Sequence, residues 1–114
     1  MSQRMIEDTV GKIEAQIQQS ESISNERKVE LLKLLATLKS EVSNLSKTHG
    51  EQAESIAGFT AVSAHEATRA QQNPELLELS LKGMSSSVDG FEKSHPQLVQ
   101  IVNAISQMLS NLGI

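Results

Sequence analysis

The sequence predicts an all-α fold, an antiparallel bundle of four to five helices with coiled-coil-like hairpins. Apolar residues recur every three or four positions in segment after segment, which is the spacing of one helix face. Short polar or Pro-containing breaks separate these segments, and such short connections make consecutive helices antiparallel neighbours. No segment shows the alternation that indicates a β-strand. The 114 residues are expected to form one helical domain, residues 1–114.

The first two predicted helices form an N-terminal hairpin over about residues 3–48. The first helix covers about residues 3–20, and Ser2 is expected to cap it. The second covers about residues 25–48 after a cap at Ser24. Each carries an apolar stripe that is expected to face the core: Ile6, Val10, Ile13 and Ile17 in the first helix, and Leu31, Leu35, Leu38, Val42 and Leu45 in the second.

An Ala-rich middle helix is predicted over about residues 51–72. His49 and Gly50 are expected to end the preceding helix, with Gly50 in a left-handed conformation. The alternative is one bent helix that continues through Gly50. The middle helix combines a seam of small residues with larger apolar anchors beside it: Ala53, Ala57, Ala64 and Ala67 in the seam, and Ile56, Phe59 and Val62 as anchors.

A C-terminal hairpin is predicted over about residues 74–112. A capping Asn73 followed by Pro74 is typical of a helix start, and this helix covers about residues 74–92. His95-Pro96 begins the last helix, about residues 96–112, with His95 as its cap and a Schellman-type ending at Gly113-Ile114. The first helix of this hairpin has an apolar stripe and a seam of small residues, which either allows another helix to approach closely or faces solvent: Leu77, Leu81, Met84, Val88 and Phe91 in the stripe, and Ser80, Gly83, Ser87, Gly90 and Ser94 in the seam.

The last helix lacks charge, since no charged residue follows Lys93. It is therefore either the central helix of the monomer or a helix that buries a second face against another copy. The second explanation is favoured because two-fold homo-oligomers are the commonest assemblies. We predict a homo-oligomer, most simply a dimer, with a helical protein partner as the alternative. The candidate interface comprises the apolar residues of this helix: Leu98, Val99, Ile101, Val102, Ile105, Met108 and Leu109.

Composition excludes several classes of function. The net charge of −4 without a basic block argues against a nucleic-acid partner. The absence of cysteine removes thiol nucleophiles and disulfides. No run of about 18 apolar residues and no export signal are evident, so we expect a cytoplasmic protein without a membrane partner. No catalytic, cofactor-binding or metal-ligating motif is found, which predicts a non-enzymatic protein without a cofactor.

One dense polar cluster remains, formed by His65, Glu66 and Arg69 on the middle helix. Its spacing places the three side chains on one side of a helix. It is similar to the H-E-x-x-H zinc motif, but Arg69 stands where the second His would be and stays protonated. We interpret the cluster as an ion pair that fastens this helix to a neighbour. A small-ligand or metal-binding site is the alternative.

The segment Phe91-Glu92-Lys93-Ser94-His95-Pro96-Gln97-Leu98 and the ending Leu109-Ser110-Asn111-Leu112-Gly113-Ile114 resemble a family of small bacterial helical proteins catalogued as a domain of unknown function. The hairpin around Glu26–Leu38 is similar to it in style. The resemblance implies a helical fold and a bacterial origin, and it brings no activity or cofactor. The predicted function is that of a non-enzymatic helical interaction or scaffold protein that self-associates, with ligand or metal binding at His65–Arg69 as the alternative.

Overall fold

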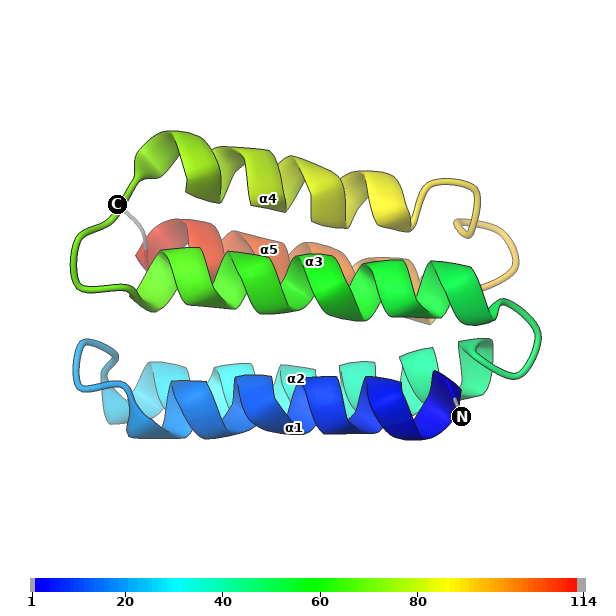
Figure 1. Ribbon diagram of the computed structural model, residues 1–114, viewed down its shortest axis with the longest axis horizontal. Helices are drawn as coiled ribbons and strands as arrows, with labels where there is room; N and C mark the ends of the chain where they lie inside the picture. Colours follow the sequence, from blue (N-terminus) through cyan, green and yellow to red (C-terminus); the bar gives the residue numbers. More distant parts are fainter. Residues whose placement is uncertain (1, 113–114) are drawn as a thin grey trace.

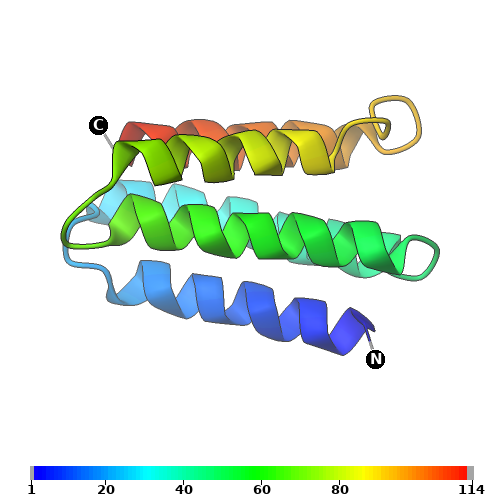
Figure 2. The same cartoon turned by 45° about the horizontal axis from the view of Figure 1, so that its top comes forward.

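The computed structural model describes residues 2–112, and every regular element within them is an α-helix (Figure 1). The helices are α1 (Ser2–Gln19), α2 (Asn25–Leu45), α3 (Gly50–Thr68), α4 (Pro74–Ser87) and α5 (Pro96–Leu112). Each helix runs antiparallel to the one before it, as Figure 2 shows from a second angle. The predicted all-α bundle is therefore confirmed.

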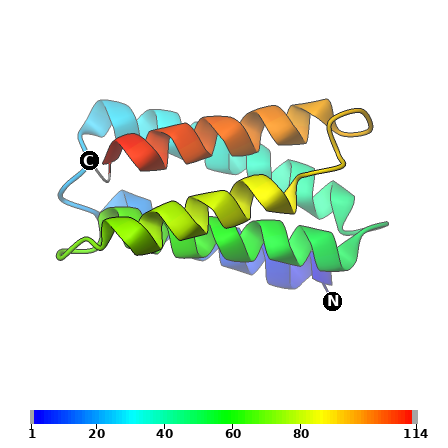
Figure 3. The same ribbon diagram turned by 90° about the horizontal axis from the view of Figure 1, so that it is seen from above.

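The five helices form two layers. Seen from above in Figure 3, α1, α3 and α4 lie in one layer, and α2 and α5 lie in the other. The middle helix α3 contacts all four other helices. Within its layer α3 lies between α1 and α4, and the other layer covers only one of its sides. The side of α3 that points away from α2 and α5 therefore faces solvent.

The core is aliphatic and lies between the layers. All nine residues of the predicted stripes on α1 and α2 are buried, and so are the four alanines of the predicted seam on α3. Removing this apolar surface from water is the main force that holds the helices together. Periodicity alone therefore located the buried faces of α1 and α2 correctly.

Helix α5 buries its apolar stripe within the monomer. Leu98, Val102, Ile105 and Leu109 are almost completely buried, because α5 packs against α2, α3 and α4. These four residues of the candidate interface are therefore covered within the monomer and have no surface left for a second copy. The remaining candidate interface residues, Val99, Ile101 and Met108, are partly buried against the same core. The exposed side of α5 carries uncharged polar residues: Gln97, Gln100, Asn103, Gln107 and Asn111.

Two of the expected caps are present. The Ser24 hydroxyl accepts a hydrogen bond from the Arg27 amide at 3.3 Å. The Asn73 side chain accepts from the amides of Glu75 and Leu76 at 3.1 and 3.2 Å. These bonds satisfy amides that have no partner inside the helix.

Several predicted helix ends need correction. Helix α1 already includes Ser2, so Ser2 is a helical residue rather than the residue before the helix. Gly50 is the first residue of α3 and not a left-handed cap, and the turn before it makes α2 and α3 two separate helices. Helix α3 ends at Thr68 because Arg69 is extended. Helix α4 ends at Ser87, shortly before Gly90 adopts a φ of 93°. The ending predicted at Gly113-Ile114 lies outside the described residues.

Candidate functional site

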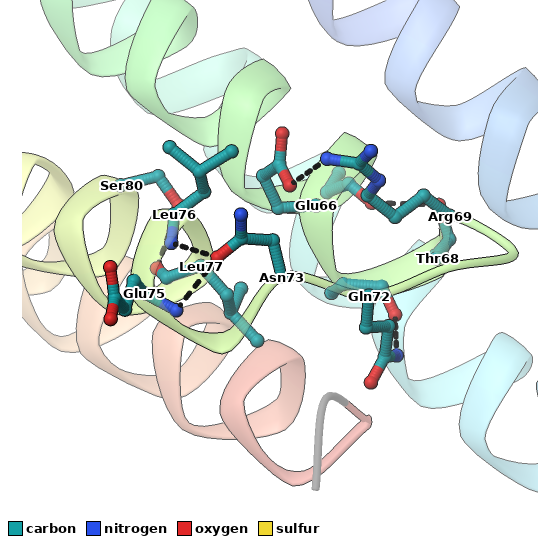
Figure 4. A network of polar contacts seen from close by, with 11 residues as sticks. Glu66, Thr68, Arg69, Gln72, Asn73, Glu75, Leu76, Leu77 and Ser80 are labelled. Atoms are coloured by element: carbon teal, nitrogen blue, oxygen red, sulfur yellow. Dashed lines mark hydrogen bonds and ion pairs between the residues drawn. The ribbon is translucent and has the colours of Figure 1, made fainter.

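Of the three residues in the predicted polar cluster, Glu66 and Arg69 form an ion pair, and His65 does not take part in it. Arg69 Nη1 donates to Glu66 Oε1 at 2.8 Å, and Glu66 is only 7% exposed (Figure 4). Arg69 is the first residue beyond α3, and its extended backbone lets the guanidinium turn back toward Glu66. The His65 side chain is exposed and makes no hydrogen bond or ion pair within residues 2–112. The ion pair therefore joins α3 to its own C-cap residue. The prediction that it fastens α3 to a neighbouring helix is wrong.

The geometry gives the metal-binding alternative no support. Within residues 2–112 no group of three or more His, Asp or Glu side chains comes close enough to hold a metal ion. His65 and Glu66 are adjacent in a helix, so their side chains point about 100° apart, as the helical geometry of 3.6 residues per turn requires. His65 and Glu66, the two candidate metal ligands, thus do not converge on a common point.

Three rings meet at one end of the bundle, where the α2–α3 and α4–α5 connections lie. Phe91 packs edge-on against His49 and His95, with ring centroids 5.5 Å apart in both pairs. The two imidazole centroids are 6.3 Å apart. Each imidazole Nδ1 shares a hydrogen bond with the hydroxyl of the preceding residue, Thr48 at 2.8 Å and Ser94 at 2.9 Å. These contacts fasten the two connections to each other.

The segment that carries the family resemblance contributes Phe91 and His95, which together with His49 form what we call the ring cluster. Glu92 accepts a hydrogen bond from the Gly90 amide at 3.0 Å, and the His95 amide donates to the Phe91 carbonyl at 2.8 Å. The segment thereby builds the tight α4–α5 connection. The His95 imidazole packs on Phe91, and no helix-capping bond from it is present in the described part of the chain. The sequence did not reveal His49 as a partner, because it lies more than forty positions away from Phe91.

An apolar surface is exposed on the broad three-helix layer. Six large hydrophobic side chains are exposed among the described residues, and four of them lie on α3 and α4: Phe59 (41%), Val62 (49%), Leu76 (43%) and Leu79 (63%). We call these four the α3–α4 apolar surface. Of the three apolar anchors predicted for the middle helix, only Ile56 is buried, and Phe59 and Val62 lie at the surface. The Phe59 ring lies against Gly83 of α4, and about half of Val62 is exposed to solvent.

Gly83 makes room for the Phe59 ring. A Cβ atom at Gly83 would lie 2.3 Å from Phe59 Cδ1 and Cε1, which no real contact allows. Ser80 is buried and Gly83 and Ser87 are half-buried on the same side of α4, so this part of the small-residue seam serves helix packing. Gly90 and Ser94 lie beyond the end of α4 and belong to the connection. The absence of a side chain at Gly83 thus allows the Phe59 ring to lie directly against α4.

Placing alanine at position 83 tests this packing. In a Phe59→Ala background, Gly83→Ala should raise the free energy of unfolding by about 0.5–1 kcal/mol, because alanine favours the helix. In the wild-type background the new methyl group must push the Phe59 ring into solvent, so the gain should vanish or reverse. Urea unfolding of the four proteins in this double-mutant cycle measures the coupling. An equal effect of Gly83→Ala in both backgrounds would show that the ring does not cover Gly83.

Fold and surface together define a small all-α bundle protein that presents an apolar strip on its three-helix layer. The chain belongs to the family described as Domain of unknown function (DUF4404), whose model matches residues 31–114. The match runs from within α2 to the end of the chain and includes the α3–α4 apolar surface and the ring cluster. No curated protein and no solved structure matches the chain. None of the helices within residues 2–112 has the length and hydropathy that crossing a bilayer demands.

Proposed function

We propose that this chain is a non-enzymatic helical interaction protein that self-associates, and that two copies meet through the α3–α4 apolar surface. The observation that carries the proposal is the concentration of exposed large hydrophobic side chains on two neighbouring helices. Single exposed hydrophobic residues are normal on a monomer, whereas a contiguous apolar patch marks a contact with another molecule. The partner in this proposal is a second copy of the chain.

The contact surface has the composition of a small interface. Phe59 and Leu79 are two of the large exposed side chains of this surface, and the Phe59 ring packs against the backbone at Gly83. Burying these side chains against a second copy removes apolar area from water, at about 25 cal/mol per Å². The apolar stripe of α5, formed by Leu98, Val102, Ile105 and Leu109, is buried in the monomer and cannot supply this contact. We therefore place the contact on α3 and α4.

Replacing Leu79 by glutamate is expected to convert a dimer into a monomer. Leu79 is 63% exposed, so the substitution should leave the fold intact while placing a charge within the apolar surface. Val29→Glu is the matched control, because Val29 is 53% exposed on α2 and lies outside the surface. Light scattering coupled to size exclusion measures the mass of each protein, and circular dichroism verifies the helix content.

The proposal requires three results together: a wild type with the mass of two chains, a monomeric Leu79→Glu variant, and a dimeric Val29→Glu variant. A wild type that stays monomeric at high micromolar concentration overturns it. Equal masses for the two variants overturn it as well, because the surface would then play no special part.

A further inference from the structure

We infer that the two copies meet across a two-fold axis that passes close to Leu79, with α4 antiparallel to the partner's α4 and Lys82 opposite the partner's Glu75. This inference rests on the proposed function, and it specifies the arrangement of the two chains. It follows from the order of apolar and charged residues along α4.

The apolar surface has two ends and a middle. Helices α3 and α4 are antiparallel, and Phe59 lies over Gly83. Moving from Phe59 to Val62 along α3 therefore corresponds to moving from Gly83 to Leu79 along α4. Leu76 lies at the far end of the α3–α4 apolar surface, beside the end of α3 (Figure 4). The middle of the strip holds Leu79, the most exposed of the four side chains. A two-fold axis at the middle places each end of the strip on the opposite end of the partner's, so the whole strip is covered.

Charges of opposite sign lie on the two sides of this middle. Glu75 precedes Leu79 by four residues, and Lys82 follows it by three, and both are exposed. In an antiparallel pairing about Leu79, Lys82 and the partner's Glu75 come level within one residue, a rise of about 1.5 Å. The axis repeats this pair, so the interface gains two ion pairs.

A parallel arrangement of the same two helices is disfavoured by charge. It would place Glu75 opposite the partner's Glu75 and Lys82 opposite the partner's Lys82, and like charges across an interface are costly. Lys82 is also free to choose a new partner. Its bond to Glu78 within the helix is 3.6 Å long, and both side chains are 72% exposed, so the pair contributes little. Charge complementarity therefore selects the antiparallel dimer.

A charge swap tests the arrangement. Lys82→Glu should weaken the dimer about tenfold, because it places two carboxylates opposite each other. Glu75→Lys should weaken it to a similar extent by opposing two ammonium groups. The double variant Glu75→Lys/Lys82→Glu should recover the wild-type dissociation constant to within about threefold, since the pair is restored with reversed sign. Sedimentation velocity over a concentration series measures the dissociation constants.

A second double variant is the matched control. Glu78→Lys/Lys82→Glu restores the pair within α4 but leaves the glutamate at 82 facing the partner's Glu75, so its dimer should stay weak. Recovery by this control, or no recovery by the Glu75–Lys82 swap, overturns the inferred arrangement. If Leu79→Glu still yields a monomer in that case, the self-association through α3 and α4 stands by itself. If Leu79→Glu leaves a dimer, both proposals fail.

Discussion

Replacing Ile105 by alanine is expected to lower the free energy of unfolding by about 2–5 kcal/mol. Ile105 is 0% exposed and lies on α5, which packs against α2, α3 and α4. It also lines a narrow core void that is too small for a water molecule. The lost methyl groups would enlarge this void, and a cavity that neither the protein nor water fills adds to the cost of lost burial.

Ile101→Ala is the control for this prediction. It removes the same atoms from the same helix, but Ile101 is only partly buried. Its cost should therefore be markedly smaller, about 1 kcal/mol. Urea unfolding followed by circular dichroism, with all proteins at one concentration, gives the two free energies. Equal losses would contradict the burial of Ile105 within the monomer, and a change of mass in Ile105→Ala would indicate an interface on this helix.

Replacing Arg69 by alanine is expected to cost about 1–3 kcal/mol of unfolding free energy. The substitution leaves the Glu66 carboxylate without its ion-pair partner at a position where only 7% of the residue is exposed. A group buried in this way loses its water without regaining a bond. Because the Arg69 side chain is 37% exposed, the loss of unfolding free energy should stay below the roughly 3–5 kcal/mol typical of fully buried ion pairs.

A double-mutant cycle with Glu66→Gln separates this cause from a general effect on the loop. In the Glu66→Gln background the buried negative charge is gone, so Arg69→Ala should cost less than it does in the wild type. Thermal or urea unfolding of the four proteins measures the coupling energy. The same loss in both backgrounds would show that Arg69 stabilises the α3–α4 connection without involving Glu66.

The arrangement at the end of α3 shows what spacing can and cannot reveal. The three-residue spacing of Glu66 and Arg69 predicted an ion pair, and the pair exists. Spacing could not show that Arg69 lies just beyond the helix, nor that His65 points elsewhere. Those facts depend on where α3 ends and on which side of it α4 covers.

The sequence by itself determined the all-α class, most of the helix ends and the buried faces of α1, α2 and α5. These features depend on local chemistry. Side chains three and four positions apart share a helix face, and a serine or asparagine before a helix caps it, whatever the rest of the chain does. The stripes Ile6–Ile17 and Leu31–Leu45 could therefore be identified without knowing what they contact.

Only the tertiary structure decided which helix covers which face. Burial of apolar surface has no preferred direction, so the stripe on α5 predicted that Leu98 and Ile105 are buried but not whether this chain or a second copy buries them. For the same reason, nothing local marked Phe59 and Val62 as surface residues, or brought His49 to Phe91 across the end of the bundle. Those outcomes follow from the central place of α3 between α1 and α4, which leaves one of its sides open to solvent.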